Sequence, residues 1–419
     1  MWDACPPGQA AGAVSSQARH RAAVIRFLAK LGVTGDWEAL RRQADVLIAM
    51  EQNTAGTWVF ILDQTLCGQQ GTKTENTYST GNRKRRLSKV RRYQKYKYAR
   101  KSCHCFVMGL LITPSGIRIP SWRSYYTAEF CKQRGKPYRK QTELAADLIR
   151  ALSVPPKARL VVLGDTAFDA KCIRDACAQR SCKWIVPMNP ERVLAGPKGK
   201  RRKVRSLLED LSAHQYAPVR LTPGQGAYAA QRRVARCRLG PKVKTRTWYV
   251  HRERRAVHSV GEVQLVFSTN EKPVRGKKVM PQKILMSNDL ERSAAELVEL
   301  YSLRWQIELF FKELKSTLGF HQYRFRCFAK VEAWVGLCLL TFQYLEWQRA
   351  RKLRSRRLDK KEKERWRWQR SHGLCLAIRH EAQEAELARL AEWTETPTGL
   401  RKLKRQLRAA RPLEYRLAS

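Results

Sequence analysis

The pattern of apolar and polar positions along the chain is typical of strands in some segments and of amphipathic helices in others. Short runs rich in β-branched and aromatic residues predict buried strands at 58–62 and 160–163. Two further strands are expected within 103–113 and 117–127, on either side of a Pro-Ser-Gly turn. A fifth strand is expected at 183–188. The chain therefore begins as a series of strands with helical segments between them.

Helical periodicity predicts the elements around these strands. One helix is expected at 140–152, and another begins at Asp169, which we expect to cap it. Residues 15–50 predict two helices, the first ending at Gly32 and the second beginning near Asp36. By analogy, three strands, a helix, a strand, a helix and a strand form the succession of a ribonuclease-H-like α/β core. In that fold the first and fourth strands are neighbours.

Two carboxylates stand at the ends of predicted strands. Asp63 directly follows the run at 58–62, and Asp165 follows the run at 160–163. A carboxylate that closes a buried strand is costly unless it meets a cation or several donors. Structural aspartates also occur at strand ends, so either one alone is a weak indication. If the two strands are neighbours, Asp63 and Asp165 lie side by side although 102 residues separate them.

Residues 301–315 contain neither proline nor glycine and predict one amphipathic helix. At 100° per residue, Tyr301, Arg304, Glu308 and Lys315 share an arc of about 60°. The structural alternative is a solvated Arg304–Glu308 ion pair, worth only a few tenths of a kcal/mol. An apolar stripe beside the arc is expected to dock the helix on a core, and it consists of Leu300, Leu303, Ile307, Phe311, Leu314 and Leu318.

The order Tyr, two residues, Arg, three residues, Glu, six residues, Lys resembles a known signature. It is that of bacterial insertion-sequence transposases of the DDE class, the cut-and-paste group named after these four residues. The resemblance implies that Glu308 is the last of three metal-binding carboxylates. It assigns contacts with transposon-end DNA to Tyr301, Arg304 and Lys315. Glu313 lies well round the helix from this arc and is expected at the surface.

The three carboxylates indicate metal-dependent chemistry. Three acids on one rim cannot all stay charged without a counter-ion. Oxygen ligands suit Mg²⁺ or Mn²⁺, and two ions about 3.5–4 Å apart form a phosphoryl-transfer site. We therefore expect Asp63, Asp165 and Glu308 to be the catalytic metal ligands of two ions, with Asp63 best placed to bridge them. The resemblance implies cleavage at terminal inverted repeats and then attack of the freed 3′-hydroxyl on target DNA, by a homodimer on the DNA.

Charge supports a nucleic-acid partner. The 419-residue chain has a formal net charge of +47, which is spread along its length. Such self-repulsion favours a polyanionic partner, and double-stranded DNA fits it best. Residues 82–101 interleave Lys and Arg with tyrosines, of which Tyr93 and Tyr96 are candidates to stack on exposed bases. A solvated basic loop is the alternative. Arg324 is expected to point toward phosphate.

A mostly β insertion is expected at 191–285, as in the transposases that the chain resembles. Alternating segments at 232–239, 246–253 and 262–269 support it. Within it, Trp248 is a candidate to stack on a flipped base, although a strand tryptophan is more often part of a core. The expected division is an N-terminal helical region that either binds DNA or packs on the next domain (1–54), the first part of the catalytic core (55–190), the insertion (191–285), the second part of the core (286–348) and a basic helical C-terminal region (349–419).

Other patterns bound the compartment and leave alternatives open. No apolar run predicts a membrane span, and the start of the chain does not resemble a secretory signal. Twelve scattered cysteines without a Cys-x-x-Cys pair fit a reducing, cytoplasmic setting, with the protein associated with the bacterial nucleoid. The alternatives are a nuclease or resolvase of the same fold without strand transfer, a catalytically silent DNA-binding protein derived from a transposase, and a basic RNA-binding structural protein.

Overall fold

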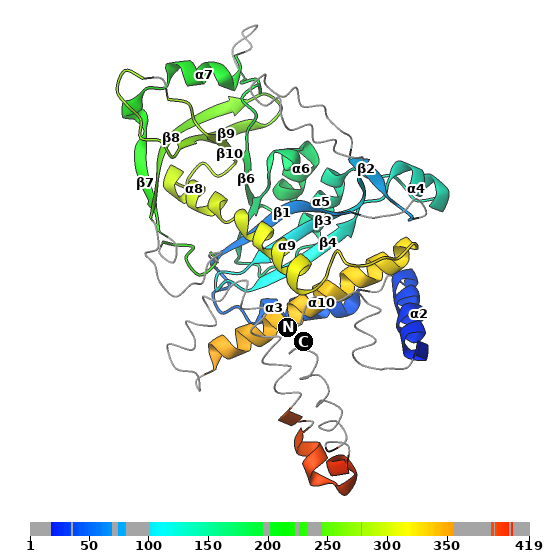
Figure 1. The fold of residues 1–419 in the computed structure, drawn as a ribbon. Coiled ribbons are helices and arrows are strands. Elements are labelled where there is room, and N and C mark those ends of the chain that lie inside the picture. Colours follow the sequence, from blue (N-terminus) through cyan, green and yellow to red (C-terminus); the bar gives the residue numbers. More distant parts are fainter. Residues whose placement is uncertain are drawn as a thin grey trace, which may run out of the picture.

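A mixed sheet forms the centre of the molecule, with helices against both faces (Figure 1). The computed structural model describes residues 18–34, 37–68, 74–80, 101–195, 202–222, 226–232, 245–277, 279–355, 387–388, 390–401 and 404. The strands are β1 (Thr57–Gly68), β2 (Tyr78–Thr80), β3 (Lys101–Ile112), β4 (Arg118–Ser124), β5 (Arg159–Leu163), β6 (Lys183–Pro187), β7 (Ala217–Leu221), β8 (Arg246–Val257), β9 (Gly261–Thr269) and β10 (Lys283–Ser287).

Helices connect and cover these strands. They are α2 (Ala18–Thr34), α3 (Glu38–Ala49), α4 (Ala128–Arg134), α5 (Gln141–Arg150), α6 (Lys171–Gln179), α7 (Val204–Asp210), α8 (Ala294–Ser302), α9 (Trp305–Thr317) and α10 (Phe328–Arg354), with 3₁₀ turns η1 (Thr166–Phe168) and η2 (Ala213–Gln215). In the described part of the chain, no helix is both long enough and apolar enough to cross a membrane.

The sheet order confirms the neighbour relation predicted for the first and fourth long strands. In the described residues the order is β2-β3-β1-β5-β6-β10-β9-β8-β7, with β4 on the outer side of β3. β1 pairs in parallel with β5, and β5 in parallel with β6. All five strands predicted between residues 58 and 188 are present. β10 pairs antiparallel with β6, so the β-rich segment continues the same sheet.

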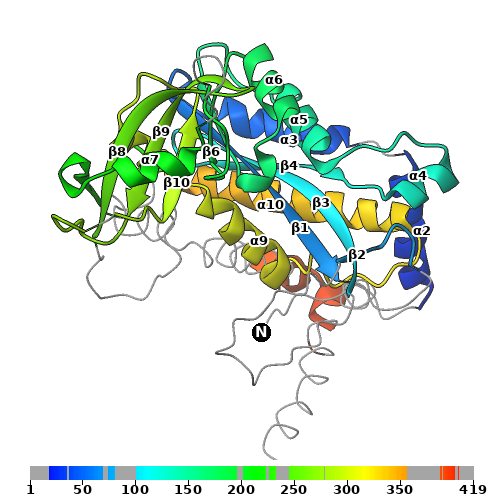
Figure 2. The same cartoon turned by 90° about the horizontal axis from the view of Figure 1, so that it is seen from above.

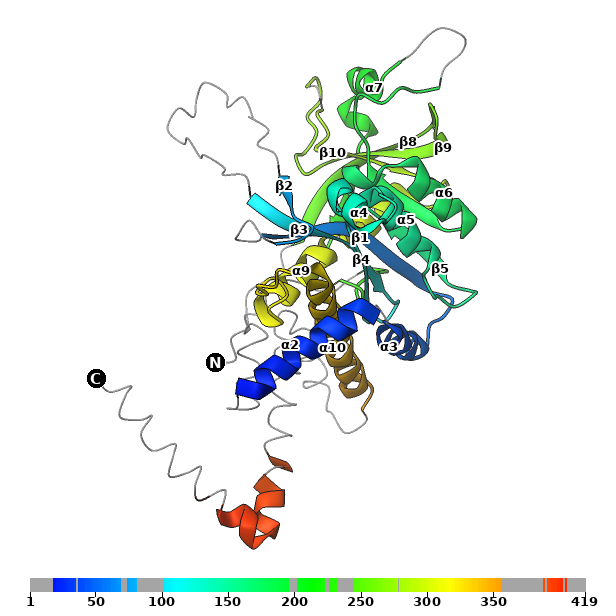
Figure 3. The same cartoon turned by 90° about the vertical axis from the view of Figure 1, so that its right-hand side faces the viewer.

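Strand β1 divides the core in two because its side chains alternate between the two faces of the sheet. Val59 and Ile61 pack in one apolar cluster with residues of α8, α9 and α10. Phe60 and Leu62 pack in the other cluster with residues of α5 and α6. Figures 2 and 3 show the sheet between these two helical layers. Asp63 continues the Val59–Ile61 face, so it lies on the side of α8 to α10.

The N-terminal helices pack on α10, and this corrects the prediction for Gly32. Helix α2 does not end at Gly32 but runs to Thr34. Gly32 instead permits close contact with α10, because a Cβ there would lie 1.9 Å from the carbonyl oxygen of Ala329. Gly336 of α10 similarly faces the ring of Trp37, the N-cap of α3. The predicted cap Asp36 lies outside the described residues.

Candidate active site

Asp63 and Asp165 are brought together by the parallel register of β1 and β5. Ile61 stands opposite Leu163, and each aspartate follows its residue of this pair two positions later in the chain. β5 ends at Leu163, and Asp165 then caps η1, its carboxylate accepting a bond from the Ala167 N–H at 2.8 Å. β1 does not end before Asp63, as predicted, but continues to Gly68 beside β3. At Asp63, β1 is therefore still paired with β3 but no longer with β5.

Asp169 does not cap α6, so that prediction is wrong. The helix begins at Lys171, with Ala170 as its N-cap. The Asp169 carboxylate instead pairs with Arg174 at 2.6 Å and with the guanidinium of Arg192. These two cations compensate the charge of Asp169, so its role is structural.

The signature residues lie on two helices and the turn between them, so the prediction of one continuous helix is wrong. Hydrogen bonds tighten to three-residue spacing here, with Leu303 N–H donating to Leu300 O at 2.9 Å and Gln306 N–H to Leu303 O at 2.8 Å. The backbone dihedrals of Leu303 and Arg304 remain helical, which keeps the side chains close to the expected spacing. Tyr301 therefore belongs to α8, Arg304 caps α9, and Glu308 and Lys315 occupy the first and last turns of α9.

Arg304 joins two of the three predicted carboxylates. Its guanidinium lies 2.5 Å from an oxygen of Glu308 and 3.4 Å from an oxygen of Asp63. The Arg304 and Asp63 side chains are each only 16% exposed, and that of Glu308 is 34% exposed. The Arg304–Glu308 ion pair of the structural alternative is therefore present, and Arg304 extends it to the more shielded Asp63. These contacts bring α9 onto the rim where β1 passes the end of β5.

The electrostatics of Asp63 show that the third carboxylate is also near. Burial, together with the charges of Asp165 and Glu308, raises the pKa of Asp63 to about 6, against the opposing effects of the Gln64 N–H and Arg304. The Gln64 N–H donates to the Asp63 carboxylate at 2.7 Å. Arg304 and two backbone donors, the N–H groups of Gln64 and Ala167, do not compensate the charge of three acids. The rim is consequently a place where added positive charge binds favourably.

Lys283 is a site residue that sequence reasoning missed. Its ammonium lies 5.1 Å from the centre of the buried Tyr301 ring. Burial and Arg304 lower the pKa of Lys283, while Glu308 opposes them, so the ammonium lies near both charges. Burial likewise raises the pKa of Tyr301 to about 12. In the sequence, Lys283 merely precedes the short apolar run at 284–286, which does not distinguish it from other lysines.

The other predicted DNA-binding residues are placed less centrally. Lys315 reaches back to β1, where its ammonium donates to Leu66 O at 3.3 Å. Arg324 is exposed. Trp248 is half-buried on β8 and packs against the cluster that contains Tyr301. Trp305, which directly follows Arg304, is 54% exposed and was not singled out from the sequence. The predictions for Tyr93 and Tyr96 fall outside the described residues.

The donor set fits a divalent cation, but the present arrangement is held by Arg304. Within the ranges that the structure describes, no three His, Cys, Asp or Glu side chains are arranged to hold one ion. The guanidinium stands between Asp63 and Glu308 and takes up the oxygens that would otherwise face an ion. Carboxylate oxygens are the ligands that Mg²⁺ and Mn²⁺ prefer. Binding by all three acids therefore requires Arg304 to release them.

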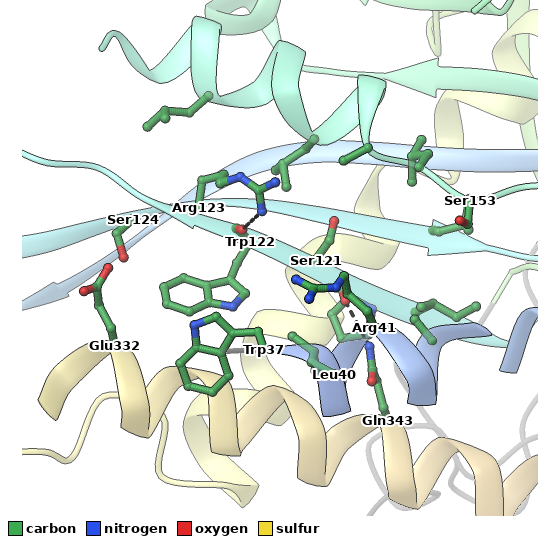
Figure 4. A pocket seen from close by; sticks show the side chains of 18 of the residues that line it. Trp37, Leu40, Arg41, Ser121, Trp122, Arg123, Ser124, Ser153, Glu332 and Gln343 are labelled. Atoms are coloured by element: carbon green, nitrogen blue, oxygen red, sulfur yellow. Dashed lines mark hydrogen bonds between the residues drawn. The ribbon is translucent and has the colours of Figure 1, made fainter. Parts of the chain in front are cut away.

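A cavity near the core lies away from these acids. It has a volume of about 550 Å³ and lies between α3, β4, α5 and α10 (Figure 4). Trp37 and Trp122 meet edge to face in its wall, with ring centres 5.9 Å apart. None of the predicted catalytic residues lines it. The candidate active site is thus the acidic rim beside α9, not this cavity.

Acids from three distant segments thus stand with cations at one end of a parallel strand pair. Comparison with known families shows the class of protein that carries them. Residues 54–343 match the family model described as the transposase DDE domain. The match spans well over half of the chain, which therefore belongs to the DDE transposase family. This family implies a polynucleotidyl transferase or nuclease that binds DNA and uses divalent metal ions. No curated protein matches the chain.

Proposed function

We propose that the protein is a bacterial insertion-sequence transposase of the cut-and-paste group. It would cleave DNA at terminal inverted repeats and transfer the 3′-hydroxyl ends into target DNA. The observation that carries the proposal is the meeting of Asp63 and Glu308 on Arg304, with Asp165 raising the pKa of Asp63. The parallel β1–β5 pair supports a ribonuclease-H-like core as the frame of this site.

Asp63, Asp165 and Glu308 would hold two Mg²⁺ or Mn²⁺ ions. When bound, the ions supply an activated water or 3′-hydroxyl and stabilise charge on the leaving oxygen. The chain's own contribution is to keep the acids on one rim and to exchange partners there. Arg304 neutralises Asp63 and Glu308 before loading, and it is then free to contact a DNA phosphate.

Cations around the rim would position the DNA. Lys283 lies over Tyr301, and Lys315 lies against β1. Their ammonium groups suit phosphate, and a transposon end would lie across them. Trp305 offers an exposed ring beside Arg304 as a stacking platform, an alternative to the half-buried Trp248. Two ends must be joined, so we infer a homodimer on DNA.

The test uses DNA that flanks the protein's own gene. The purified protein is incubated with this DNA and a supercoiled plasmid, with Mg²⁺, with Mn²⁺ or with chelator. Cuts at inverted repeats and joined products are expected only with metal. Asp63→Ala, Asp165→Ala and Glu308→Ala should each abolish cleavage and retain DNA binding. Any one of these variants that cuts normally contradicts the proposal.

Two other outcomes would favour the alternatives. Metal-dependent nicking without joined products would indicate a nuclease or resolvase built on the same site. Tight binding without cleavage under every metal condition would indicate a silent DNA-binding protein. The wild-type protein and the three carboxylate variants separate these cases, because only a catalytic protein loses an activity when an acid is removed.

A further inference from the structure

A buried group of four charges lies behind the helix that carries Glu308. Arg118 is on β4, Glu313 is on α9, and Glu346 and Arg349 are on α10. All four residues are at most 5% exposed. The prediction of a surface position for Glu313 is therefore wrong, because its side chain points into the molecule. We call these four residues the buried charge cluster.

The buried charge cluster connects three elements through short contacts. Arg118 donates to the Glu313 carboxylate at 2.6 Å, and its backbone N–H donates to Glu346 at 2.9 Å. Glu346 also accepts bonds from Arg349 at 2.5 and 3.0 Å. Burial lowers the pKa of Arg118, but Glu313 and Glu346 raise it more, so the guanidinium stays charged. Two cations and two anions balance, and the contact of Arg118 with Glu313 joins β4 to α9.

Stability alone is a poor reason for such a cluster. Removing charges from water costs several kcal/mol per ion, and well-packed apolar residues often stabilise a core equally well. In some proteins, however, a buried charged contact fixes the arrangement of the elements that it joins, because a slip would leave a buried charge without its partner.

The arrangement that this pair specifies is the rotation of α9. Glu313 follows Glu308 by five residues, which places it about 140° round the helix. Holding Glu313 inward against Arg118 therefore holds Glu308 outward, on the rim with Asp63. A slip of one residue would rotate α9 by about 100° and carry Glu308 off the rim. The apolar residues of α9 do not prevent this slip as strictly, because they occupy a broad stripe.

We propose that Arg118 and Glu313 are a positioning pair, which fixes α9 so that Glu308 points toward Asp63 and Asp165. This inference rests on the proposed function for the role of Glu308 as a ligand. Neither residue touches the reacting groups. Their effect is on the geometry of the ligand set, so it should be measurable as metal affinity in the absence of DNA and of turnover.

The test compares two double variants that each remove one cation and one anion from the buried charge cluster. Arg118→Met with Glu313→Leu breaks the link to α9. Glu346→Gln with Arg349→Met removes two charges on α10 but leaves both members of the Arg118–Glu313 contact in place, and it serves as the matched control. Mn²⁺ binding is titrated by calorimetry in full-length protein without DNA, and thermal unfolding is followed in chelator. Glu313→Gln, which keeps the shape of the side chain, is included in case the first double variant fails to fold.

The expected result is a selective loss of metal affinity. The Arg118–Glu313 variant should bind Mn²⁺ about 10-fold or more weakly, as when groups that orient metal ligands are removed. The control should change by less than about twofold at a similar unfolding temperature. Equal Mn²⁺ affinity in wild type, both double variants and Glu313→Gln would overturn the positioning role.

Failure of the proposed function would look different. In that case Glu308→Ala would bind Mn²⁺ as tightly as wild type, and no protein would cut DNA. The positioning role alone fails when Glu308→Ala loses affinity but the Arg118–Glu313 variant does not. A loss of affinity in both double variants in proportion to their lowered unfolding temperatures would also overturn it, since the cluster would then act only through stability.

Discussion

At the residue scale, the site is held together by charges that do not balance. Asp63 meets one cation, Arg304, which it shares with Glu308, while Asp165 adds a further negative charge. Lys283 and Lys315 stand near this group without forming an ion pair with it in the described residues. This charge imbalance lowers the stability of the protein at the position where a metal ion and a phosphate would bind.

The raised pKa of Asp63 predicts how stability depends on pH in chelator. The group's pKa is 3.8 when unperturbed and about 6 in the fold. Between these values the unfolded chain releases a proton that the folded protein keeps, so the free energy of unfolding falls as pH rises. A pKa difference of about two units corresponds to about 3 kcal/mol of stability, which is lost once the pH is above 6.

Asp63→Asn removes this titration. At pH 7 to 8 the free energy of unfolding of the variant should exceed that of wild type by up to about 3 kcal/mol, and the difference should shrink toward pH 4. Denaturant unfolding in chelator across this range measures it. A difference that is constant with pH would show that Asp63 has an ordinary pKa. The same variant should be inactive, so stability would rise as function is lost.

Lys283 gives a second residue-scale prediction. Its ammonium, over Tyr301 and near Glu308, is placed to meet a phosphate on the rim. Lys283→Met should weaken binding of inverted-repeat DNA and lower the slope of log affinity against log salt by about one. Lys157→Met is the control, since Lys157 is exposed before the start of β5, at the opposite end from Asp165. Equal losses in both variants would remove Lys283 from the site.

At the element scale, the strands could be predicted because their apolar runs are local and strong. The runs at 58–62 and 160–163 became β1 and β5, and their pairing brought Asp63 and Asp165 together as expected. Helical side-chain spacing around Arg304 was also predicted correctly. The break between α8 and α9 was not, because it depends on hydrogen bonds that tighten without any proline or glycine to mark them.

Buried charges were the main source of error. Glu313 reads as a surface residue on a helical wheel, and only its contact with Arg118, 195 residues away, makes it a core residue. Asp169 was predicted to be a helix cap, but its carboxylate pairs with Arg192, 23 residues away. Periodicity reports which side chains share a face, but it does not report which distant partner satisfies a polar group. Lys283 was missed for the same reason.

Gly336 provides a prediction about how the N-terminal helices dock. A Cβ at this position would lie 1.9 Å from a carbon of the Trp37 ring. Gly336→Ala should therefore destabilise the protein by about 1–3 kcal/mol, as overpacking does, and loosen α3 from α10. Gly68→Ala is the control, because a Cβ there meets nothing within 4 Å. Thermal unfolding of both variants measures the effect, and similar melting temperatures would mean that Trp37 moves aside freely.

At the scale of the whole molecule, the predicted insertion and the catalytic core share one sheet. β10 joins β6 on one side and β9 on the other, so strands from 217–287 extend the sheet that carries Asp63. Sequence patterns identified these strands but not their order, because the pairing of β6 with β10 spans about a hundred residues. The domain boundaries stay a prediction.

The distributed charge of the molecule separates two kinds of DNA binding. The chain has 83 Lys and Arg residues, so removing two of them changes the overall field only slightly. Arg304→Gln with Lys315→Gln should therefore leave the affinity for random duplex DNA and its salt dependence almost unchanged. The preference for the inverted-repeat end over random DNA should fall at least about tenfold, since both side chains lie on the rim that would orient the end.

Titration of both duplexes in chelator at two salt concentrations gives these quantities. Equal weakening on both DNAs would show that the rim contributes charge but no recognition, and specificity would then have to come from outside it.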